Sequence, residues 1–369
     1  MLTYFGENFD SGTYDQIKTA MGLPVAVKGA LMPDAHQGYA LPIGGVIALR
    51  NAISPSMVGY DIACRMSCTF FNIDPEQMEV EKQNILQKIL ASTSFGIGSE
   101  GSKPEHPIMD DRRWGSSKIL SELKDLAWSQ LGSSGSGNHF AAFMSVKMGD
   151  DECGALVTHS GSRGTGYKVA SHFCEVAQNQ VDGQGIHRDY AWLDTETEEG
   201  QQYITAMQLM GDYAKANHRI IHRKFSNLFE YEEGSHFENH HNFAWLEEID
   251  GEKLWVHRKG ATPAHEDEFG VIPGSMATTS YIVKGKGNPD SLFSASHGAG
   301  RVSSRRQAKK NFDEELYEAV IEDLGIVTHG IARDESFMAY KDIEAVMDAQ
   351  KDCVNVVATM QPRVEVMAG

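Results

Sequence analysis

A long amphipathic helix is the feature of this 369-residue chain that most restricts its fold. It is predicted over residues 199–229, where the apolar stripe consists of Ile204, Met207, Met210, Tyr213, Ala214, His218, Ile221 and Phe225. Such a stripe must be covered by other elements, and many of the remaining apolar segments are short and strand-like. The sequence therefore predicts an α+β fold.

The rest of the chain alternates short elements with polar loops. Further helices are predicted at 14–21, 75–90, 116–131, 167–180, 313–324 and 342–350. Strands are predicted at 24–31, 41–49, 66–73, 140–143, 154–157, 254–256, 270–272, 281–283 and 353–359. Polar loops are predicted at 32–38, 92–115, 238–242, 257–261 and 273–276. No internal repeat or linker interrupts this pattern, which predicts a single domain over residues 1–369.

Composition narrows the possible partners and compartment. The net charge of −18 argues against a general basic coat for nucleic acid, so a polyanion would need a local basic site or bound metal. Five scattered cysteines form no disulfide framework. The N-terminus does not resemble a signal peptide, and no apolar run approaches the ~20 residues of a membrane span. These features predict a cytoplasmic protein without a membrane partner.

Five possible metal ligands lie at predicted turns, loops and segment ends. Asp61 and Cys64 are three residues apart in one turn, while His139, His159 and His241 follow or occupy polar segments. A thiolate, imidazoles and a carboxylate suit Mn, Fe, Co or Zn, without choosing between them. A single histidine or cysteine is more often a packed residue, and spacing alone does not show that these five converge.

Phosphate has several candidate partners. The possible donors are Asn138, Ser160, Ser162, Ser275 and the amides around Gly274 and Gly298. The side chains of Arg163, Lys259 and Arg301 could clamp phosphoryl oxygens. Solvated surface charge is the preferred interpretation of four further cations, Arg305, Arg306, Lys309 and Lys310.

The stretch 294–301 places His297 beside glycines and immediately before cations. It fits a phosphate site, and it also fits a glycine-rich turn before a charged helix. His297 could act as a general base, a metal ligand or a nucleophile that forms a phosphoramidate with a nucleotide. The residues together indicate a metal-dependent phosphoryl or nucleotidyl transfer enzyme and leave its substrate open.

An ordered set of motifs resembles the RtcB family of RNA-splicing ligases. They are Met-Pro-Asp-x-His at 32–36, Ile-Gly-Gly-Val at 43–46, Val-Gly-x-Asp-Ile-x-Cys at 58–64, Gly-Ser-Gly-Asn-His-Phe at 135–140, His-Ser-Gly-Ser-Arg-Gly at 159–164, His-His-Asn at 240–242, Arg-Lys-Gly-Ala at 258–261, Ile-Pro-Gly-Ser-Met at 272–276, Ser-His-Gly-Ala-Gly-Arg at 296–301 and Met-Ala-Tyr-Lys-Asp-Ile at 338–343. Each motif alone is weak, but the order of the set is specific and covers nearly the whole chain.

The resemblance implies an α+β domain with a β-sandwich core flanked by helices. It further implies a GTP- and manganese-dependent ligase that joins RNA with a 2′,3′-cyclic phosphate or 3′-phosphate to RNA with a 5′-hydroxyl. His297 would take GMP from GTP and pass it to the RNA 3′-phosphate, and the 5′-hydroxyl would then expel GMP. An archease-type activator is implied for some members.

The same resemblance implies the roles of individual residues. One Mn²⁺ would be held by Asp61, Cys64 and His139, and a second by Cys64, His159 and His241. Catalytic support beside His297 would come from Arg163, Lys259 and Arg301. The implied nucleotide-binding residues are Asn138, His139, His241, Asn242, Pro273, Gly274, Ser275, Met276, His297, Gly298, Ala299, Gly300 and Tyr340.

Three positions depart from the family pattern. Ala142 stands where the family has a guanine-reading glutamate, and Ala368 stands where it has a lysine at the base. Loss of both side chains predicts relaxed base discrimination, with GTP or another nucleoside triphosphate as substrate. Arg65 replaces a glycine after Cys64, and it is expected to crowd or recharge the metal pocket.

Two other functions fit the same residues. One is a metal-dependent nucleotidyl transferase or phosphohydrolase that acts on other phosphorylated ends. The other is a non-catalytic RNA-binding paralogue, although such a protein has little reason to keep all five metal ligands.

Overall fold

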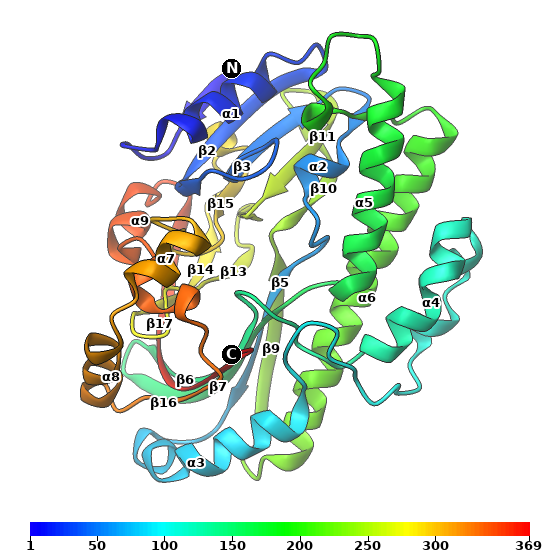
Figure 1. Ribbon diagram of the computed structural model, residues 1–369. Helices are drawn as coiled ribbons and strands as arrows, with labels where there is room; N and C mark the ends of the chain where they lie inside the picture. Colours follow the sequence, from blue (N-terminus) through cyan, green and yellow to red (C-terminus); the bar gives the residue numbers. More distant parts are fainter.

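Two β-sheets form the centre of the computed structural model, which describes residues 1–369 (Figure 1). The smaller sheet has the strand order β1-β2-β3-β11-β10. The larger has the order β13-β14-β17-β6-β7-β5-β9, with β16 paired beside β17. Helices surround the sheets, and α5 and α6 run side by side along one flank (Figure 1). The predicted α+β class with a β-sandwich core is confirmed.

The strands include all nine of the predicted ones, usually with longer bounds. They are β1 (Leu2–Tyr4), β2 (Ala26–His36), β3 (Ile43–Leu49), β4 (Ala52–Ile53), β5 (Arg65–Phe71), β6 (Phe140–Met148), β7 (Asp151–Ser160), β8 (Leu193–Asp194), β9 (Glu233–His240), β10 (Asn242–Ile249), β11 (Glu252–Lys259), β12 (Ala261–Pro263), β13 (Phe269–Ile272), β14 (Ser280–Gly285), β15 (Ser294–Ser296), β16 (Val327–His329) and β17 (Val354–Met367).

The helices follow the predicted apolar periodicity closely. They are α1 (Ser11–Met21), α2 (Pro55–Val58), α3 (Pro75–Ser92), α4 (Lys118–Gln130), α5 (Arg163–Gln180), α6 (Glu198–Leu228), α7 (Arg305–Asn311), α8 (Glu314–Asp323) and α9 (Ile343–Ala349). Asp74 caps α3, because its side chain accepts a hydrogen bond from the Gln77 amide. None of the helices combines the length and apolar character needed to cross a membrane.

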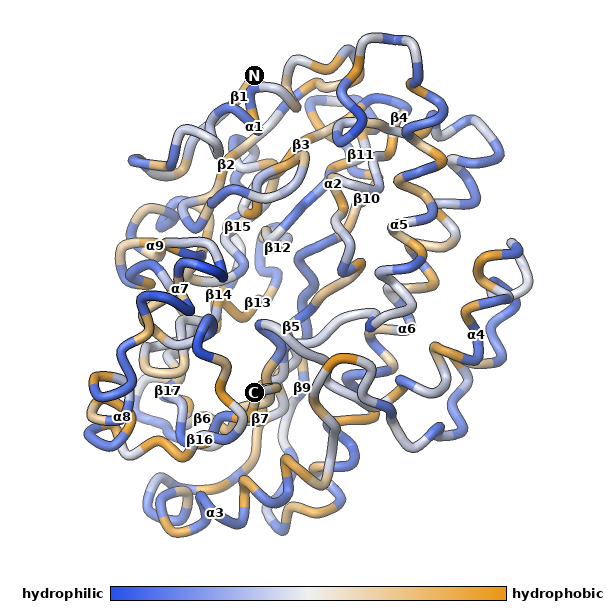
Figure 2. Tube along the Cα trace, in the orientation of Figure 1, coloured by the Kyte–Doolittle hydropathy of each residue, from blue (hydrophilic) through white to orange (hydrophobic).

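The long helix α6 organises the largest hydrophobic cluster. Thr197 caps its first turn, where the negative charges of Glu198 and Glu199 interact favourably with the positive end of the helix dipole. Its buried stripe packs with α4 and α5, around side chains such as Phe173, Met207 and Tyr213. Figure 2 shows hydrophobic and hydrophilic residues alternating along α5 and α6, as expected of helices with one buried face.

Several predicted loops are strands. Met32 to His36 continue β2, residues 238–242 close β9 and open β10, and residues 257–259 close β11. Their Pro, Asp, Asn and His residues gave a loop signal, but pairing with distant strands satisfies the backbone. The predicted loop at 92–115 also contains two short 3₁₀ turns, Pro107–Asp110 and Arg112–Gly115.

The two sheets meet where the chain crosses between them. His241 is the single residue that separates β9 of the larger sheet from β10 of the smaller sheet. Cys64 directly precedes β5, His139 directly precedes β6, and His159 lies at the end of β7. Because these strands pair in the antiparallel order β6-β7-β5-β9, the four residues lie together at one end of the strands of the larger sheet.

Candidate active site

Five side chains with possible metal-ligand atoms converge at these strand ends. The Cys64 Sγ lies 3.0 Å from His159 Nε2 and 3.5 Å from His139 Nε2. His139 Nε2 is 2.9 Å from Asp61 Oδ2, and His159 Nε2 is 3.2 Å from His241 Nε2. The donors form two overlapping groups, Asp61–Cys64–His139 and Cys64–His159–His241, with Cys64 common to both. The structure thus brings together all five predicted metal ligands.

Backbone carbonyls orient two of the imidazoles. His139 Nδ1 lies 3.0 Å from the Ser134 carbonyl oxygen, and His159 Nδ1 lies 3.0 Å from that of Asn138. A proton on each Nδ1 satisfies these contacts and leaves the Nε2 lone pair directed into the cluster. The loop 131–138, which has the composition of a flexible linker, therefore works as a rigid support for two ligands.

Burial sets the protonation of the cluster. It lowers the pKa of His159 and of His241 well below the ordinary value, which keeps both rings neutral and able to donate a lone pair. Burial raises the pKa of Asp61, but the His139 contact outweighs it, and the net pKa is lowered. Burial and Asp61 raise the pKa of the Cys64 thiol, so a bound cation would have to displace its proton.

Gly161 makes room for the cluster. A Cβ atom at this position would lie 2.2 Å from Asp61 Oδ1, far inside van der Waals contact. Only glycine therefore allows the chain after β7 to pass so close to the Asp61 carboxylate.

His297 lies beside the cluster and is held by a carboxylate that our sequence analysis did not assign to the site. It follows β15, and its ring centroid is 4.9 Å from that of His241. Its Nδ1 lies 2.7 Å from Oδ2 of Asp34, which is fully buried in β2. Asp34 belongs to the Met-Pro-Asp-x-His motif, which was the available signal for its role. This contact leaves His297 Nε2 free to act as a base or a nucleophile.

The backbone after His297 approaches β2 closely. Gly300 has a φ of +74°, and a Cβ there would lie 2.1 Å from the Asp34 carbonyl oxygen. The glycine-rich turn thus packs the His297 loop directly on the strand that supplies Asp34.

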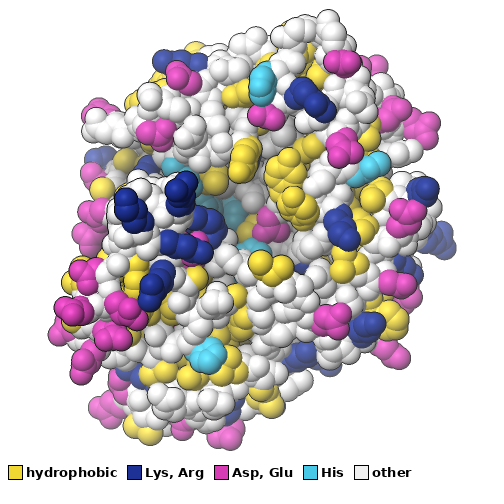
Figure 3. Space-filling model, in the orientation of Figure 1, with side chains coloured by type: hydrophobic (Ala, Val, Ile, Leu, Met, Phe, Trp, Pro, Cys, Tyr) yellow, Lys and Arg dark blue, Asp and Glu magenta, His cyan; other side chains and the backbone are white.

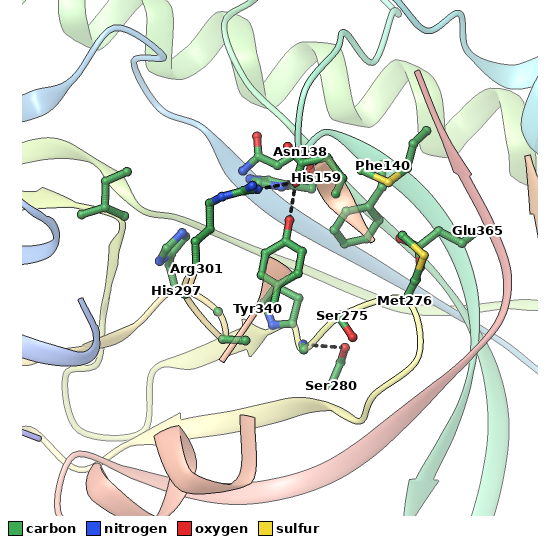
Figure 4. A pocket seen from close by; sticks show the side chains of 18 of the residues that line it. Asn138, Phe140, His159, Ser275, Met276, Ser280, His297, Arg301, Tyr340 and Glu365 are labelled. Carbon is green, nitrogen blue, oxygen red and sulfur yellow. Dashed lines mark hydrogen bonds and ion pairs between the residues drawn. The ribbon is translucent and has the colours of Figure 1, made fainter. Parts of the chain in front are cut away.

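A cavity opens beside the metal-ligand cluster (Figure 4). His159 and His297 lie along its wall. It also contains ten other residues predicted for phosphate or nucleotide: Asn138, Pro273, Gly274, Ser275, Met276, Gly298, Ala299, Gly300, Arg301 and Tyr340. Segments far apart in the sequence therefore form one binding wall, with aromatic, small and cationic side chains.

Two predicted catalytic cations lie outside this cavity. Arg163 begins α5 and donates hydrogen bonds to Ser133 and Ser99 beneath the loop that carries His139. Lys259 is buried, donates to the carbonyls of Tyr39 and Ser56, and has a pKa lowered to about 8 by burial. Asn242 also supports the backbone, since it contacts Asp61 and Gly260 rather than the cavity. These side chains act on the shape of the site in this structure.

Several cavity residues were missed by sequence reasoning. Glu335 is buried and binds Arg301, Arg305 and the Tyr340 hydroxyl. Arg305, interpreted from sequence as a solvated charge, therefore lines the cavity and is ion-paired. The other missed lining residues are His36, Ile43, Phe140, Met144, Ser280, Glu365 and Met367. His36, Ile43 and Phe140 belong to the quoted motifs, which were the available signal, whereas no motif marked the others.

A basic rim borders the cavity mouth. Figure 3 shows histidines on the floor of the central hollow and a group of Lys and Arg side chains beside it. A shallow groove on this side is lined by Arg301, Arg305 and Arg306, and Lys309 follows on the same helix, α7. The protein carries a net charge of −18, so this rim is a local exception to the overall charge.

Arg65 does not crowd the metal ligands, contrary to the sequence-based expectation. Its guanidinium lies 2.9 Å from Glu238 and donates to the Gly211 carbonyl, in a separate polar hollow between β5 and α6. Arg65 still acts on the donor cluster electrostatically, because its backbone N–H and its charge both lower the pKa of the Cys64 thiol against the larger effect of burial.

The fold and this site together define an α+β protein with two overlapping groups of side chains that could hold metal ions, beside a cavity lined by polar and cationic residues. A family model described as "tRNA-splicing ligase RtcB" matches residues 16–126 and 109–368. The chain is 32% identical to the RNA-splicing ligase RtcB of Escherichia coli K12, covering 90% of this chain and 88% of that protein. It is 30% identical to the tRNA-splicing ligase RtcB of Thermococcus kodakarensis, covering 95% and 90% respectively. The tRNA-splicing ligase RtcB of Archaeoglobus fulgidus is 31% identical, covering 90% of this chain and 85% of that protein. The chain belongs to the RtcB family.

Proposed function

We propose that this protein is an RNA ligase that joins a 2′,3′-cyclic phosphate or 3′-phosphate end to a 5′-hydroxyl end through a nucleotidylated His297. The observation that carries the proposal is the position of His297, which Asp34 orients from one side while the donor cluster lies on the other. An imidazole held through Nδ1 in this way directs its Nε2 atom outward, as a nucleophile toward phosphorus requires.

The donor cluster fits two Mn²⁺ ions. Asp61, Cys64 and His139 would hold one ion, and Cys64, His159 and His241 the other. The carbonyl contacts of His139 and His159 already direct their Nε2 atoms inward, as metal ligands require. When bound, the ions would neutralise phosphate charge and polarise phosphoryl oxygens.

The cavity supplies the nucleotide site, with GTP as the proposed nucleotide. Asn138, Ser275 and the backbone of 298–300 would hold the phosphates, and Arg301 would add positive charge. The Tyr340 ring, which also lies under Arg301, would pack against the base. Arg163 and Lys259 are assigned an indirect part, in which they fix the loops that bear His139 and the cavity mouth.

A 2′,3′-cyclic phosphate end would first be opened by water, with the 2′-oxygen leaving as a hydroxyl and a 3′-phosphate remaining. From the 3′-phosphate, the reaction would proceed in three steps. His297 Nε2 attacks the α-phosphorus of GTP, the bond to the β-phosphate oxygen breaks, and pyrophosphate leaves. An oxygen of the RNA 3′-phosphate then takes the GMP group and releases His297. Finally, the 5′-hydroxyl attacks the activated 3′-phosphate, loses its proton and expels GMP, which leaves a 3′,5′-phosphodiester.

The RNA would cross the basic rim. Arg305, Arg306 and Lys309 lie beside the cavity mouth, where they could meet backbone phosphates leading to the reactive end. We assign the whole chain to one domain and place it in the cytoplasm, where its five free cysteines would stay reduced. An archease-type activator is a further proposed partner.

An RNA-joining assay tests this function. A labelled RNA with a 3′-phosphate and a second RNA with a 5′-hydroxyl, incubated with protein, Mn²⁺ and GTP, should give a joined product. RNA that gains a nucleotide cap but is never joined would favour a nucleotidyl transferase instead. Tight RNA binding without Mn²⁺ and without turnover would favour a non-catalytic paralogue.

A further inference from the structure

A buried carboxylate without a protein partner faces the cavity. Glu365 is only 5% exposed and lies on β17, where it lines the cavity. In Figure 4 its side chain points toward Phe140 and Met276. Buried carboxylates in proteins normally have a hydrogen-bond donor or a cation beside them.

The surroundings of Glu365 contain no such compensation. Burial alone raises the pKa of its carboxyl group to about 8, with no contribution from a hydrogen bond or a neighbouring cation. The adjoining cavity residues Met144, Met276 and Met367 are apolar. A buried, unpaired carboxylate in a cavity is typical of a ligand-binding group, which accepts hydrogen bonds from the donors of a bound ligand.

Strand register explains how the carboxylate reaches the cavity. Glu365 is the direct partner of Ala142 in the antiparallel pair β17–β6, and Met367 is the partner of Phe140. Directly opposed residues share one face of a sheet, so the four side chains lie on the same surface. Ala142 contributes only a methyl group, which leaves space for the longer side chain from the neighbouring strand.

We propose that Glu365 is the specificity-determining residue for the base and accepts hydrogen bonds from N1–H and N2–H of guanine. This inference rests on the nucleotide site proposed above. The two carboxylate oxygens match the two adjacent donors of guanine. Adenine presents an acceptor beside a donor and leaves one oxygen of an ionised carboxylate unpaired. Guanine binding therefore selects the ionised form of Glu365 and releases its proton when the pH is below about 8. The carboxylate thus stands on β17, opposite the alanine at 142, and the relaxed base preference expected from Ala142 is replaced by selection for guanine.

Equilibrium binding of GTP, ITP and ATP to the Mn²⁺-loaded protein tests this role. ITP lacks the N2 amino group, so the wild type should bind it about tenfold more weakly than GTP, and ATP about 10- to 100-fold more weakly. Glu365→Gln has nearly the same shape but presents one acceptor and one donor. It should lose GTP affinity by a similar factor and bind ATP better than the wild type does, which a general loss of folding would not produce.

A second pair of variants tests the geometry. Glu365→Ala should bind the three nucleotides with similar affinities, and adding Ala142→Glu to it should restore the preference for GTP from the opposite strand. Glu318→Gln, on the exposed side of α8, is the matched control and should leave all three affinities unchanged.

The outcomes separate this inference from the proposed function. Equal nucleotide affinities in the wild type, or an unchanged ranking in Glu365→Gln, would overturn the role of Glu365 while leaving ligation through His297 intact. Conversely, selective GTP binding that Glu365→Gln reverses, in a protein that forms no joined RNA, would support the role and reject the ligase.

Discussion

Asp34 Oδ2 lies 2.7 Å from His297 Nδ1 and 3.3 Å from the His297 backbone nitrogen. One carboxylate oxygen therefore fixes both the ring and the main chain of the proposed nucleophile, across 263 positions of sequence. The carboxylate is fully buried, and the packing of Gly300 against the same strand maintains the arrangement. The tautomer and direction of His297 are thus set before any nucleotide enters.

Asp34→Asn should slow nucleotide transfer to His297 without preventing nucleotide binding. An amide at this position can donate to Nδ1 and so favour the wrong tautomer, and we expect a rate loss on the order of 100-fold or more. Single-turnover adduct formation gives the rate, and equilibrium GTP binding gives the affinity. Asp348→Asn, at an exposed carboxylate on α9, is the matched control. A parallel loss of affinity and rate would show that Asp34 only holds the fold together.

The shared position of Cys64 predicts an unequal effect of ligand substitutions on metal content. Cys64→Ala should lower the affinity for both ions, because Cys64 belongs to both donor groups. His241→Ala should lower mainly the affinity for one ion. Binding of Mn²⁺ followed by electron paramagnetic resonance counts the bound ions. Two ions should also raise the thermal stability of the wild type, and chelator should reverse that gain. Full Mn²⁺ stoichiometry in Cys64→Ala would contradict the assignment of Cys64 to both donor groups.

The basic rim should affect RNA binding separately from nucleotide transfer. Arg306→Glu with Lys309→Glu removes two cations that do not contact the metal ligands, so the His297 adduct should form at the normal rate. RNA affinity should fall, and the slope of log affinity against log salt should decrease by about 1 for each lost phosphate contact. Filter binding over a range of salt concentrations measures both. An unchanged salt slope would place the RNA elsewhere.

The burial of the Glu365 carboxyl group should make the stability of the protein depend on pH. Its carboxyl pKa is about 8 when folded and near 4.5 in its ordinary state, so the folded protein binds the extra proton between these values. Stability from this group is fully present below pH 4.5 and is lost as the pH rises through 8. Relative to wild type, Glu365→Gln should gain stability on the order of a few kcal/mol between about pH 5 and about pH 8.5. Tyr317 on α8 is a titrating neighbour of this carboxyl group.

Urea unfolding of the metal-free wild type and Glu365→Gln at about pH 5 and about pH 8.5 gives the difference in their free energies of unfolding. The difference reports on Glu365, because all other groups titrate alike in the two proteins. The substitution Tyr317→Phe, made in both proteins, should leave the difference unchanged. A constant stability gap between wild type and Glu365→Gln at the two pH values would contradict the burial of an unpaired carboxylate.

Local patterns in the sequence predicted the helices well and the site only in part. The apolar stripe of α6 depends on neighbouring residues, so its position could be predicted directly from the sequence. The donor residues could be named, but their convergence depends on the order of β6, β7, β5 and β9, which local spacing does not encode. The polar ends of β9 and β11 looked like loops for the same reason.

The roles of Asp34 and Glu365 could not be predicted from the sequence. Asp34 sat in a segment predicted as a loop, and only the packing of β2 against the turn after β15 gives it a partner. Glu365 lay beyond the predicted end of the last strand, and its role follows from pairing with Ala142. Both depend on contacts between residues far apart in the sequence, which a single sequence leaves open.

The most direct test of the account is the mass of the protein after incubation with Mn²⁺ and GTP. We predict an acid-labile GMP adduct on the wild type, mapped by peptide analysis to His297, absent from His297→Ala and discharged by RNA with a 3′-phosphate. The absence of an adduct, or an equal adduct on His297→Ala, would contradict the assignment of His297 as the nucleophile.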